Sequence, residues 1–263
     1  MRQGWNAEDY AKNSSAQMEW AEELMAKLEL SGAESILDIG CGDGKITARL
    51  SRRVGSGSVL GIDLSEEMIQ LASRTYPAEA WPNLAFLRTD AADLRLPRWF
   101  DVAFSNAALH WVEDQHAVLR SVYSCLKPGG RILFQMGGRG NASEIVACMT
   151  AIMKRDRWRP YFEDFTPPYR FFGPEEYRDW LVETGLRPVR VELAQKDMQH
   201  AGMEGLTGWL RTTWFPYTDR LPPEMRAPFL EEVAERYVAD NPVGPDGRTH
   251  VNMVRLEVEA CMP

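Results

Sequence analysis

Residues 35–53 read SILDIGCGDGKITARLSRR, and this stretch decides the fold. Its first five residues, 35–39, form a short apolar run that predicts a buried β-strand. The glycine-rich residues 40–44 predict a tight turn, because glycine adopts positive φ without steric cost. Residues 45–53 then predict a helix. A strand that passes through a glycine-rich turn into a helix is typical of the ligand-binding edge of a parallel α/β sheet.

The same alternation continues along the chain. Further strands are expected at 58–62, 84–88, 100–105, 131–135, 186–194 and 251–260. Helices are expected at 16–30, 66–75, 116–126, 141–154, 174–183, 205–213 and 223–239, and a turn at 127–130. Strands that alternate with helices imply βαβ units and a parallel sheet. We therefore predict an α/β fold with a doubly wound, seven-stranded, mostly parallel sheet, an antiparallel final pair of strands and a helical cap.

Composition excludes several classes of protein. The 263 residues include 30 Lys+Arg and 38 Asp+Glu, a net charge of −8, which disfavours binding to nucleic acid or to anionic membranes. No run of about 18 apolar residues predicts a membrane span. Four scattered cysteines predict free thiols in a reducing cytoplasm, and four scattered histidines have no metal-ligand spacing. We expect a cytoplasmic monomer without a metal.

Three acidic residues lie at the ends of three successive predicted strands: Asp38, Asp63 and Asp90. The loop glycines follow a GxGxG pattern, which differs from the GxGxxG of dinucleotide-binding proteins. Asp38 precedes Gly40 by two residues, where a carboxylate would repel a phosphate and suit a cationic ligand. An acid at the position of Asp63 can accept hydrogen bonds from both ribose hydroxyls. The pattern predicts a pocket for a nucleoside with a zwitterionic tail.

The chain resembles the class I S-adenosylmethionine-dependent methyltransferases, which have a Rossmann-like fold, over residues 33–136. Four motifs carry the resemblance: ILDIGCGDG at 36–44, GIDLSEEM at 61–68, RTDAADL at 88–94 and LKPGG at 126–130. It implies S-adenosyl-L-methionine as the cofactor. The implied cofactor-binding residues are Asp38, Gly40, Cys41, Gly42 and Gly44 for the methionine part, Asp63 and Leu64 for the ribose, Asp90 and Ala91 for the adenine, Asn106 beside the methionine amino group, and Tyr10 and Lys12.

Two subfamilies resemble the chain around residues 105–111, SNAALHW, which in this fold line the methyl-transfer site. They are the trans-aconitate methyltransferases and the juvenile hormone acid methyltransferases, and both methylate a carboxylate oxygen. The second resemblance implies that Gln17 and Trp111 hold the acceptor carboxylate. The implied substrate is a small-molecule acid, either a polyacid or an apolar acid.

The role of His110 stays open between a general base, an orienting residue and a structural residue. A carboxylate is ionised at neutral pH, so its attack on the sulfonium methyl needs placement and removal of water, and no base. A base at His110 would favour a hydroxyl acceptor. The alternatives are a C-, N- or hydroxyl-O-methyltransferase and a non-enzymatic cofactor-binding module. A dinucleotide oxidoreductase is disfavoured by the glycine spacing and by Asp38.

We expect one methyltransferase domain over residues 1–263. Its cofactor-binding part is expected at about 30–136, and the N-terminal helix within 1–30 and a cap at about 137–246 are expected to form the acceptor site. The cap is rich in aromatic side chains, which can cover an apolar site. Residues 202–208 would suit a lid. A polyacid would need cations, for which the candidates are Arg139, Arg170, Arg211 and Arg220.

Overall fold

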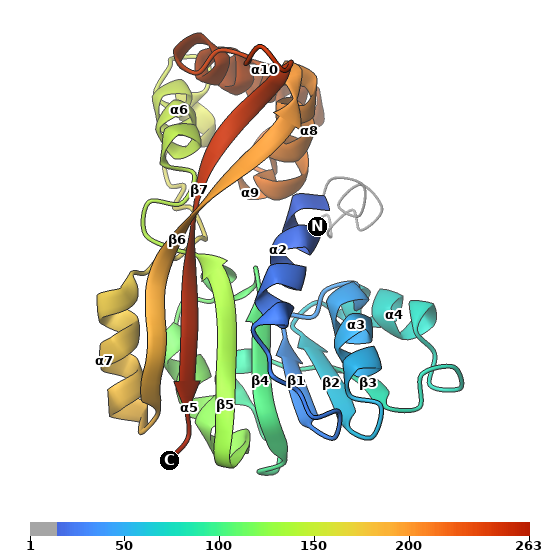
Figure 1. Cartoon of the computed structure of the whole chain (residues 1–263). Coiled ribbons are helices and arrows are strands. Elements are labelled where there is room, and N and C mark those ends of the chain that lie inside the picture. Colours follow the sequence, from blue (N-terminus) through green and yellow to red (C-terminus); the bar gives the residue numbers. More distant parts are fainter. Residues whose placement is uncertain (1–14) are drawn as a thin grey trace. The chain divides into compact units, whose positions relative to one another are not determined.

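The computed structural model describes residues 15–263, with side chains from residue 18 onward. It contains a seven-stranded sheet of order β3-β2-β1-β4-β5-β7-β6 (Figure 1). The strands are β1 (Ser35–Ile39), β2 (Ser58–Asp63), β3 (Leu84–Arg88), β4 (Phe100–Asn106), β5 (Leu126–Gly137), β6 (Arg187–Ala201) and β7 (Arg248–Cys261). Strands β1 to β5 pair in parallel, and β7 is antiparallel to β5. The predicted doubly wound, mostly parallel α/β sheet is confirmed.

The helices of the described residues are α2 (Ser15–Ala26), α3 (Lys45–Arg53), α4 (Glu66–Thr75), α5 (Gln115–Cys125), α6 (Ser143–Met153), α7 (Pro174–Thr184), α8 (Gly202–Thr213), α9 (Phe215–Thr218) and α10 (Pro223–Asp240). Some of them cover both faces of the sheet. Helices α2 and α3 bury Met25 and Leu50 against one face, around Phe104. Helices α5 and α7 bury Leu119 and Leu181 against the other face. With both faces covered, the central strands β1, β4 and β5 are buried almost throughout.

Local signals decide where the helices begin and end. The Ser65 side chain accepts a hydrogen bond from the backbone N–H of Met68 and caps α4, as its sequence position predicts. Two acids in the first turn of α4, Glu66 and Glu67, favour the same start, because the helix dipole is positive there. Gly185, with φ of +93°, ends α7 in the left-handed conformation, which glycine adopts without steric cost.

Two expectations need correction. The predicted turn at 127–130 lies inside β5, where the ladder with β4 shifts register. Pro128 lacks an N–H and Gly129 has φ of +75°, so the ladder is interrupted without ending the strand. Strands β6 and β7 are longer than predicted, because the added residues of β6 are mostly polar and exposed and lack an apolar pattern. Residues 202–208, for which the sequence suggests a lid, form the start of α8.

The described chain forms two compact units. The sheet unit contains Gln17–Arg139, Tyr169–Ala194 and Arg255–Pro263, and the helical unit contains Gly140–Pro168 and Gln195–Val254. Strands β6 and β7 contribute residues to both units. In residues 15–263 no helix is long and apolar enough to cross a membrane.

Candidate functional site

The glycine-rich loop between β1 and α3 can be built only with glycine at two positions. Gly40, Gly42 and Gly44 have φ of +72°, +54° and +80°. A Cβ atom on Gly40 would lie 2.1 Å from the Cβ of Ala108, and one on Gly44 would lie 2.7 Å from the Cζ of Phe86. Such distances are far below van der Waals contact, so the loop passes directly against Ala108, after β4, and against Phe86 of β3.

Asp63 joins the end of β2 to this loop. Its Oδ2 accepts the backbone N–H of Gly42 at 3.0 Å, and its Oδ1 accepts the N–H of Ser65 at 2.9 Å. Burial raises the pKa of Asp63 above its usual value. Each carboxylate oxygen keeps a further lone pair for a ligand hydroxyl. The next residue, Leu64, leaves 64% of its surface exposed beside this carboxylate.

Asp38 lies deeper, at the end of β1, and is only 2% exposed. Its Oδ2 accepts a hydrogen bond of 2.7 Å from the Thr47 hydroxyl on α3. Burial raises the pKa of Asp38 to about 7, and the nearby charge of Asp63 acts in the same direction. Burial also raises the pKa of the Cys41 thiol, which is therefore protonated at neutral pH. A cation placed near Asp38 would favour its ionised form.

Asp90 lies at the end of β3 and is exposed. Its Oδ1 accepts the N–H of Ala92 at 2.8 Å and caps the short 3₁₀-helix η1 (Ala91–Asp93). The N–H of Thr89 donates to the carbonyl of Asp63 at 3.1 Å, so the ends of β2 and β3 lie together. The three predicted acids therefore share one edge of the sheet.

Two buried amide side chains meet where β4 and β5 end. Asn106 and Gln135 are register partners, and they are 8% and 1% exposed. The Nε2 of Gln135 donates to Oε1 of Glu257 at 3.0 Å, which leaves Oε1 of Gln135 pointing the other way. Among residues 18–263, the side-chain oxygens of Asn106 and Gln135 are buried without a hydrogen-bond partner. Both are acceptors, so they suit a ligand with N–H donors.

The segment after β4 forms a strained turn. Ala107 has φ of +57°, and its N–H donates to the carbonyl of Gln135 at 2.8 Å. The 3₁₀-helix η2 (Leu109–Trp111) follows, with Leu109 buried in the core. A non-glycine residue in the left-handed region is unusual and is often found at functional sites.

His110 is held in one tautomer. Its Nδ1 lies 3.3 Å from the backbone N of Gly137, which donates to it. Nδ1 is therefore unprotonated, and Nε2 carries the proton of the neutral ring. Burial and the charge of Arg255 lower the pKa of His110 to about 3. At neutral pH this side chain can donate a hydrogen bond from Nε2, but it is a very weak base.

Aromatic residues from a later segment pack against this turn. The rings of Tyr169 and Trp111 have centroids 4.7 Å apart, and Phe171 lies 5.9 Å from the ring of His110. The N–H of Arg170 donates to the carbonyl of His110 at 2.8 Å and fixes the segment in place. The result is an aromatic wall beside His110 and Trp111.

Comparison with known proteins identifies the family. A family model described as a methyltransferase domain matches residues 36–130. A trans-aconitate 2-methyltransferase of Delftia acidovorans is 31% identical over 271 residues, covering 97% of both chains. A second, from Variovorax paradoxus, is 29% identical and also covers 97% of both chains. The chain belongs to the class I S-adenosylmethionine-dependent methyltransferases.

A solved structure of a methyltransferase with bound cofactor product shares the fold. Phosphoethanolamine N-methyltransferase 2 of Haemonchus contortus, in complex with S-adenosylhomocysteine, matches with a TM-score of 0.62 and 17% identity, covering 98% of this chain and 57% of that chain. The family and this structural neighbour show that our protein uses S-adenosylmethionine as its cofactor. Its sulfonium and ammonium are cations, and the buried Asp38 and the unpartnered amide oxygens of Asn106 and Gln135 are groups that suit them.

Several of the predicted site residues are either not described by the structure or already paired within the protein. Tyr10 and Lys12 lie outside the described residues. Gln17 lies in α2, three residues before the buried Trp20, and its side chain is not among those described. Two of the arginines proposed for a polyacid bind acids of the protein itself: Arg139 pairs with Glu175 and Glu176, and Arg170 pairs with Glu113.

Sequence reasoning missed Gln135, Arg255 and Glu257. A signal was present, because each is a polar residue inside an apolar strand and each is less than 5% exposed. In β7 the charged residues alternate with apolar ones over 255–260, RLEVEA, which is the pattern of a strand with one polar face. Among residues 15–263 no group of three or more His, Cys, Asp or Glu side chains could hold a metal ion.

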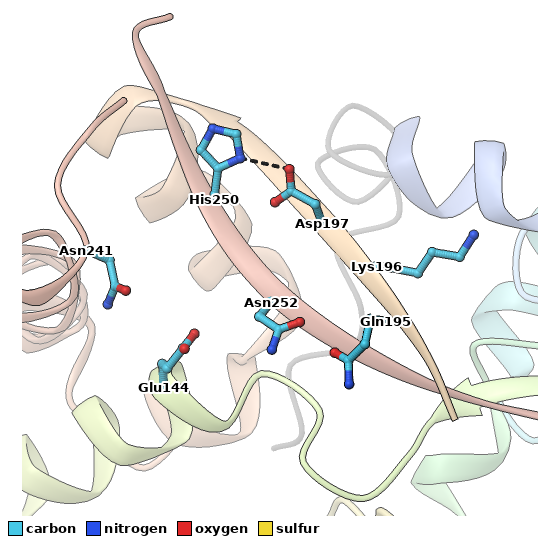
Figure 2. A pocket seen from close by; sticks show the side chains of 7 residues that line it. All are labelled: Glu144, Gln195, Lys196, Asp197, Asn241, His250 and Asn252. Atoms are coloured by element: carbon cyan, nitrogen blue, oxygen red, sulfur yellow. Dashed lines mark hydrogen bonds and ion pairs between the residues drawn. The ribbon is translucent and has the colours of Figure 1, made fainter. Parts of the chain in front are cut away.

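The helical unit has a polar hollow of its own, with a volume of about 480 Å³. Seven residues line it: Glu144, Gln195, Lys196, Asp197, Asn241, His250 and Asn252. Figure 2 shows His250 of β7 beside Asp197 of β6, and their Nδ1 and Oδ2 atoms are 2.8 Å apart. The hollow contains none of the predicted site residues.

Proposed function

We propose that this methyltransferase transfers the methyl group to a carboxylate oxygen of a small acid. The state of His110 carries the proposal. The ring accepts the Gly137 N–H at Nδ1, and burial lowers its pKa to about 3, so His110 is neutral and a very weak base at neutral pH. A hydroxyl acceptor would need a base there, whereas a carboxylate is already ionised.

The trans-aconitate 2-methyltransferases of Delftia acidovorans and Variovorax paradoxus support the same reaction, because their similarity extends over 97% of this chain. S-adenosylmethionine supplies a methyl group on a positively charged sulfur. In our proposal the residues of this chain bind that cofactor, exclude water and orient the acceptor. Neutral donors orient the acceptor carboxylate and leave it nucleophilic. They are the side chains of Gln17 and Trp111 and the Nε2–H of His110.

The cofactor contacts follow the resemblance. Asp38 and the glycine-rich loop would hold the methionine part, Asp63 and Leu64 the ribose, and Asp90 with Ala91 the adenine. Asn106 would accept from the ammonium. We further propose that the chain works as a single methyltransferase domain and that residues 137–246 help to select the acceptor.

The test is a methyl-transfer assay with tritiated cofactor over a panel of polyacids, apolar monoacids, phenols and amines. Methyl esters release volatile methanol in mild base. With one or more of the acids, we therefore expect a tritiated product that releases its label as methanol in base. Label that is stable to base, with a phenol or an amine as the acceptor, would contradict carboxylate methylation. Asp63→Ala serves as the control, and we expect it to abolish cofactor binding in calorimetry.

A further inference from the structure

Gln135, near the end of β5, has a buried amide beside that of Asn106. Phe104 of β4 and Leu133 of β5 are register partners that pack with Met25 of α2 in one core cluster. Two residues further along each strand, Asn106 and Gln135 are again register partners, so their side chains leave the same face of the sheet. Neighbouring strands lie about 4.8 Å apart, which is close enough for one ligand group to contact both amides.

Glu257 fixes the direction in which the amide of Gln135 points. The carboxylate accepts hydrogen bonds from Lys27, from Arg190 and from Nε2 of Gln135, the last at 3.0 Å. Burial by itself would raise the pKa of Glu257, but the hydrogen bonds from the two cations outweigh it and keep the group ionised. An ionised carboxylate has no proton to donate, so only the NH₂ end of the amide can face it. The carbonyl oxygen of Gln135 is therefore held on the side away from Glu257.

Within residues 18–263, the side-chain oxygens of Asn106 and Gln135 are buried and have no hydrogen-bond donor. Folded proteins rarely leave such atoms unpaired unless a ligand or a water supplies the donor. A carboxylate acceptor has no N–H, and two carbonyl dipoles would repel it. In S-adenosylmethionine the sulfonium has no N–H either, and the proposed partners of the ribose and the adenine are Asp63 and Asp90. The ammonium is the donor group that remains, and its charge strengthens each hydrogen bond.

We propose that Gln135 is a further cofactor-binding residue, whose Oε1 accepts a hydrogen bond from the ammonium of S-adenosylmethionine, and that Glu257 is its positioning residue. Asn106 is the other acceptor, so two neutral oxygens share the donors of one ammonium. Lys27 and Arg190 act indirectly, because they keep Glu257 ionised. This inference extends the proposed cofactor contacts and does not depend on which acceptor receives the methyl group.

The test measures how strongly the protein prefers S-adenosylhomocysteine to an analogue in which hydrogen replaces the amino group. Calorimetry gives both dissociation constants, and the preference is the dissociation constant of the analogue divided by that of S-adenosylhomocysteine. Gln135→Met keeps the length of the side chain and removes the oxygen. We expect the preference to fall about tenfold, because a hydrogen bond to a charged group is lost. Affinity for the analogue should change little.

Gln115→Met is the matched control. Gln115 is also only 1% exposed, but its amide bonds the hydroxyl of Tyr177 and the carbonyl of Arg170. Its replacement disturbs the core to a similar degree without touching the proposed ammonium site. We therefore expect the preference for S-adenosylhomocysteine to stay at the wild-type value.

A second set of variants tests the positioning role. Glu257→Gln can turn either end of its own amide toward Gln135, so the carbonyl oxygen is no longer held and the preference should fall by a smaller factor. Combined with Gln135→Met, the same change should lower the preference no further than Gln135→Met alone, because Glu257 acts through Gln135. Glu192→Gln removes an exposed acid that also pairs with Arg190, and it should keep the wild-type preference.

Equal losses of affinity for both ligands in Gln135→Met would overturn the inference, and so would a wild-type protein that does not distinguish them. If Gln135→Met fails to fold, Gln135→Asn draws the amide back by one carbon and should lower the preference in its place; an unchanged preference there contradicts the inference too. A further fall in the double variant would overturn the positioning role of Glu257. The methyl-transfer panel tests the acceptor separately, so carboxylate methylation and the role of Gln135 can each fail without the other.

Discussion

Asp38 is a buried carboxyl whose protonation the cofactor should control. Its pKa of about 7 lies above the ordinary value of 3.8, because burial disfavours the charge. In the free protein this group stabilises the fold at low pH, and its contribution is lost as the pH rises from 3.8 through 7. A bound cation reverses the preference, so cofactor binding near neutral pH should release a proton.

We therefore predict that affinity for S-adenosylmethionine rises about tenfold between about pH 6 and about pH 8. Calorimetry in buffers of different ionisation enthalpy measures both the affinity and the released proton. Asp38→Asn should bind more weakly and show neither effect. Asp43→Asn, a change in the same loop at a carboxylate paired with Lys45, should keep both. An unchanged pH dependence in Asp38→Asn would exclude Asp38 as the titrating group.

His110 is a donor in our account, and its substitution tests that role. His110→Gln keeps a neutral donor and should stay within a few-fold of wild type, and His110→Ala should lose about tenfold in kcat/KM on an acid acceptor. Removal of a general base would cost about 100-fold or more. Cofactor affinity, measured by calorimetry, is the control. A loss of that larger size with cofactor binding intact would show that His110 acts as a base.

At the scale of elements, the loop after β1 and the turn after β4 pack directly against each other. The Cβ that Gly40 lacks would collide with Ala108, which precedes η2. The strained turn at Ala107 and the positive φ of Gly40 hold the backbone in this close approach. The glycine-rich loop and the turn after β4 are thus positioned by one contact.

Gly40→Ala should lower the free energy of unfolding by about 2–4 kcal/mol, because the collision and the left-handed φ both oppose a side chain. Cofactor affinity should fall with it. Adding Ala108→Gly removes the colliding atom, so the double variant should recover part of the lost stability. The remaining loss comes from the left-handed φ that alanine must adopt at position 40. Urea unfolding of both variants measures this. Equal stabilities for Gly40→Ala and the double variant would contradict the collision.

At the scale of the whole sheet unit, Glu257 joins residues that are distant in the sequence. It is 2% exposed and binds Lys27, which follows α2, Arg190 of β6 and Gln135 of β5. Burial by itself would raise the pKa of Glu257, but the hydrogen bonds from Lys27 and Arg190 outweigh it and the pKa lies below its ordinary value. The group therefore stabilises the fold at neutral pH, and this contribution is lost as the pH falls below 4.5.

Glu257→Gln should destabilise the protein by about 3 kcal/mol at neutral pH, because it leaves two cations facing a buried neutral group. The difference from wild type should shrink in acid. Glu192→Gln removes an exposed acid that also pairs with Arg190 and should cost less than about 1 kcal/mol. If urea unfolding shows the same loss of unfolding free energy for Glu257→Gln and Glu192→Gln, the burial of Glu257 does not strengthen its ion pairs.

Much of the sheet could be predicted from local patterns. Strands β1 and β3 and helices α3 and α4 lie where their residues indicate, because short apolar runs, glycines and the serine cap of α4 act over a few residues. The ends of β6 and β7 could not be predicted in this way. Their added residues are largely polar, and only pairing within the sheet makes them strands.

The sequence by itself determined the α/β class, the glycine-rich loop and the three acids at the strand ends, since these follow from local patterns and from the common edge of parallel strands. The tertiary structure alone decided the neutral state of His110, the buried place of Arg255 beside Trp20, and the bond between Lys27 and Glu257, which are 230 residues apart. The physical reason is that burial and long-range charge depend on which distant residues share a face. No pattern within one segment contains that information.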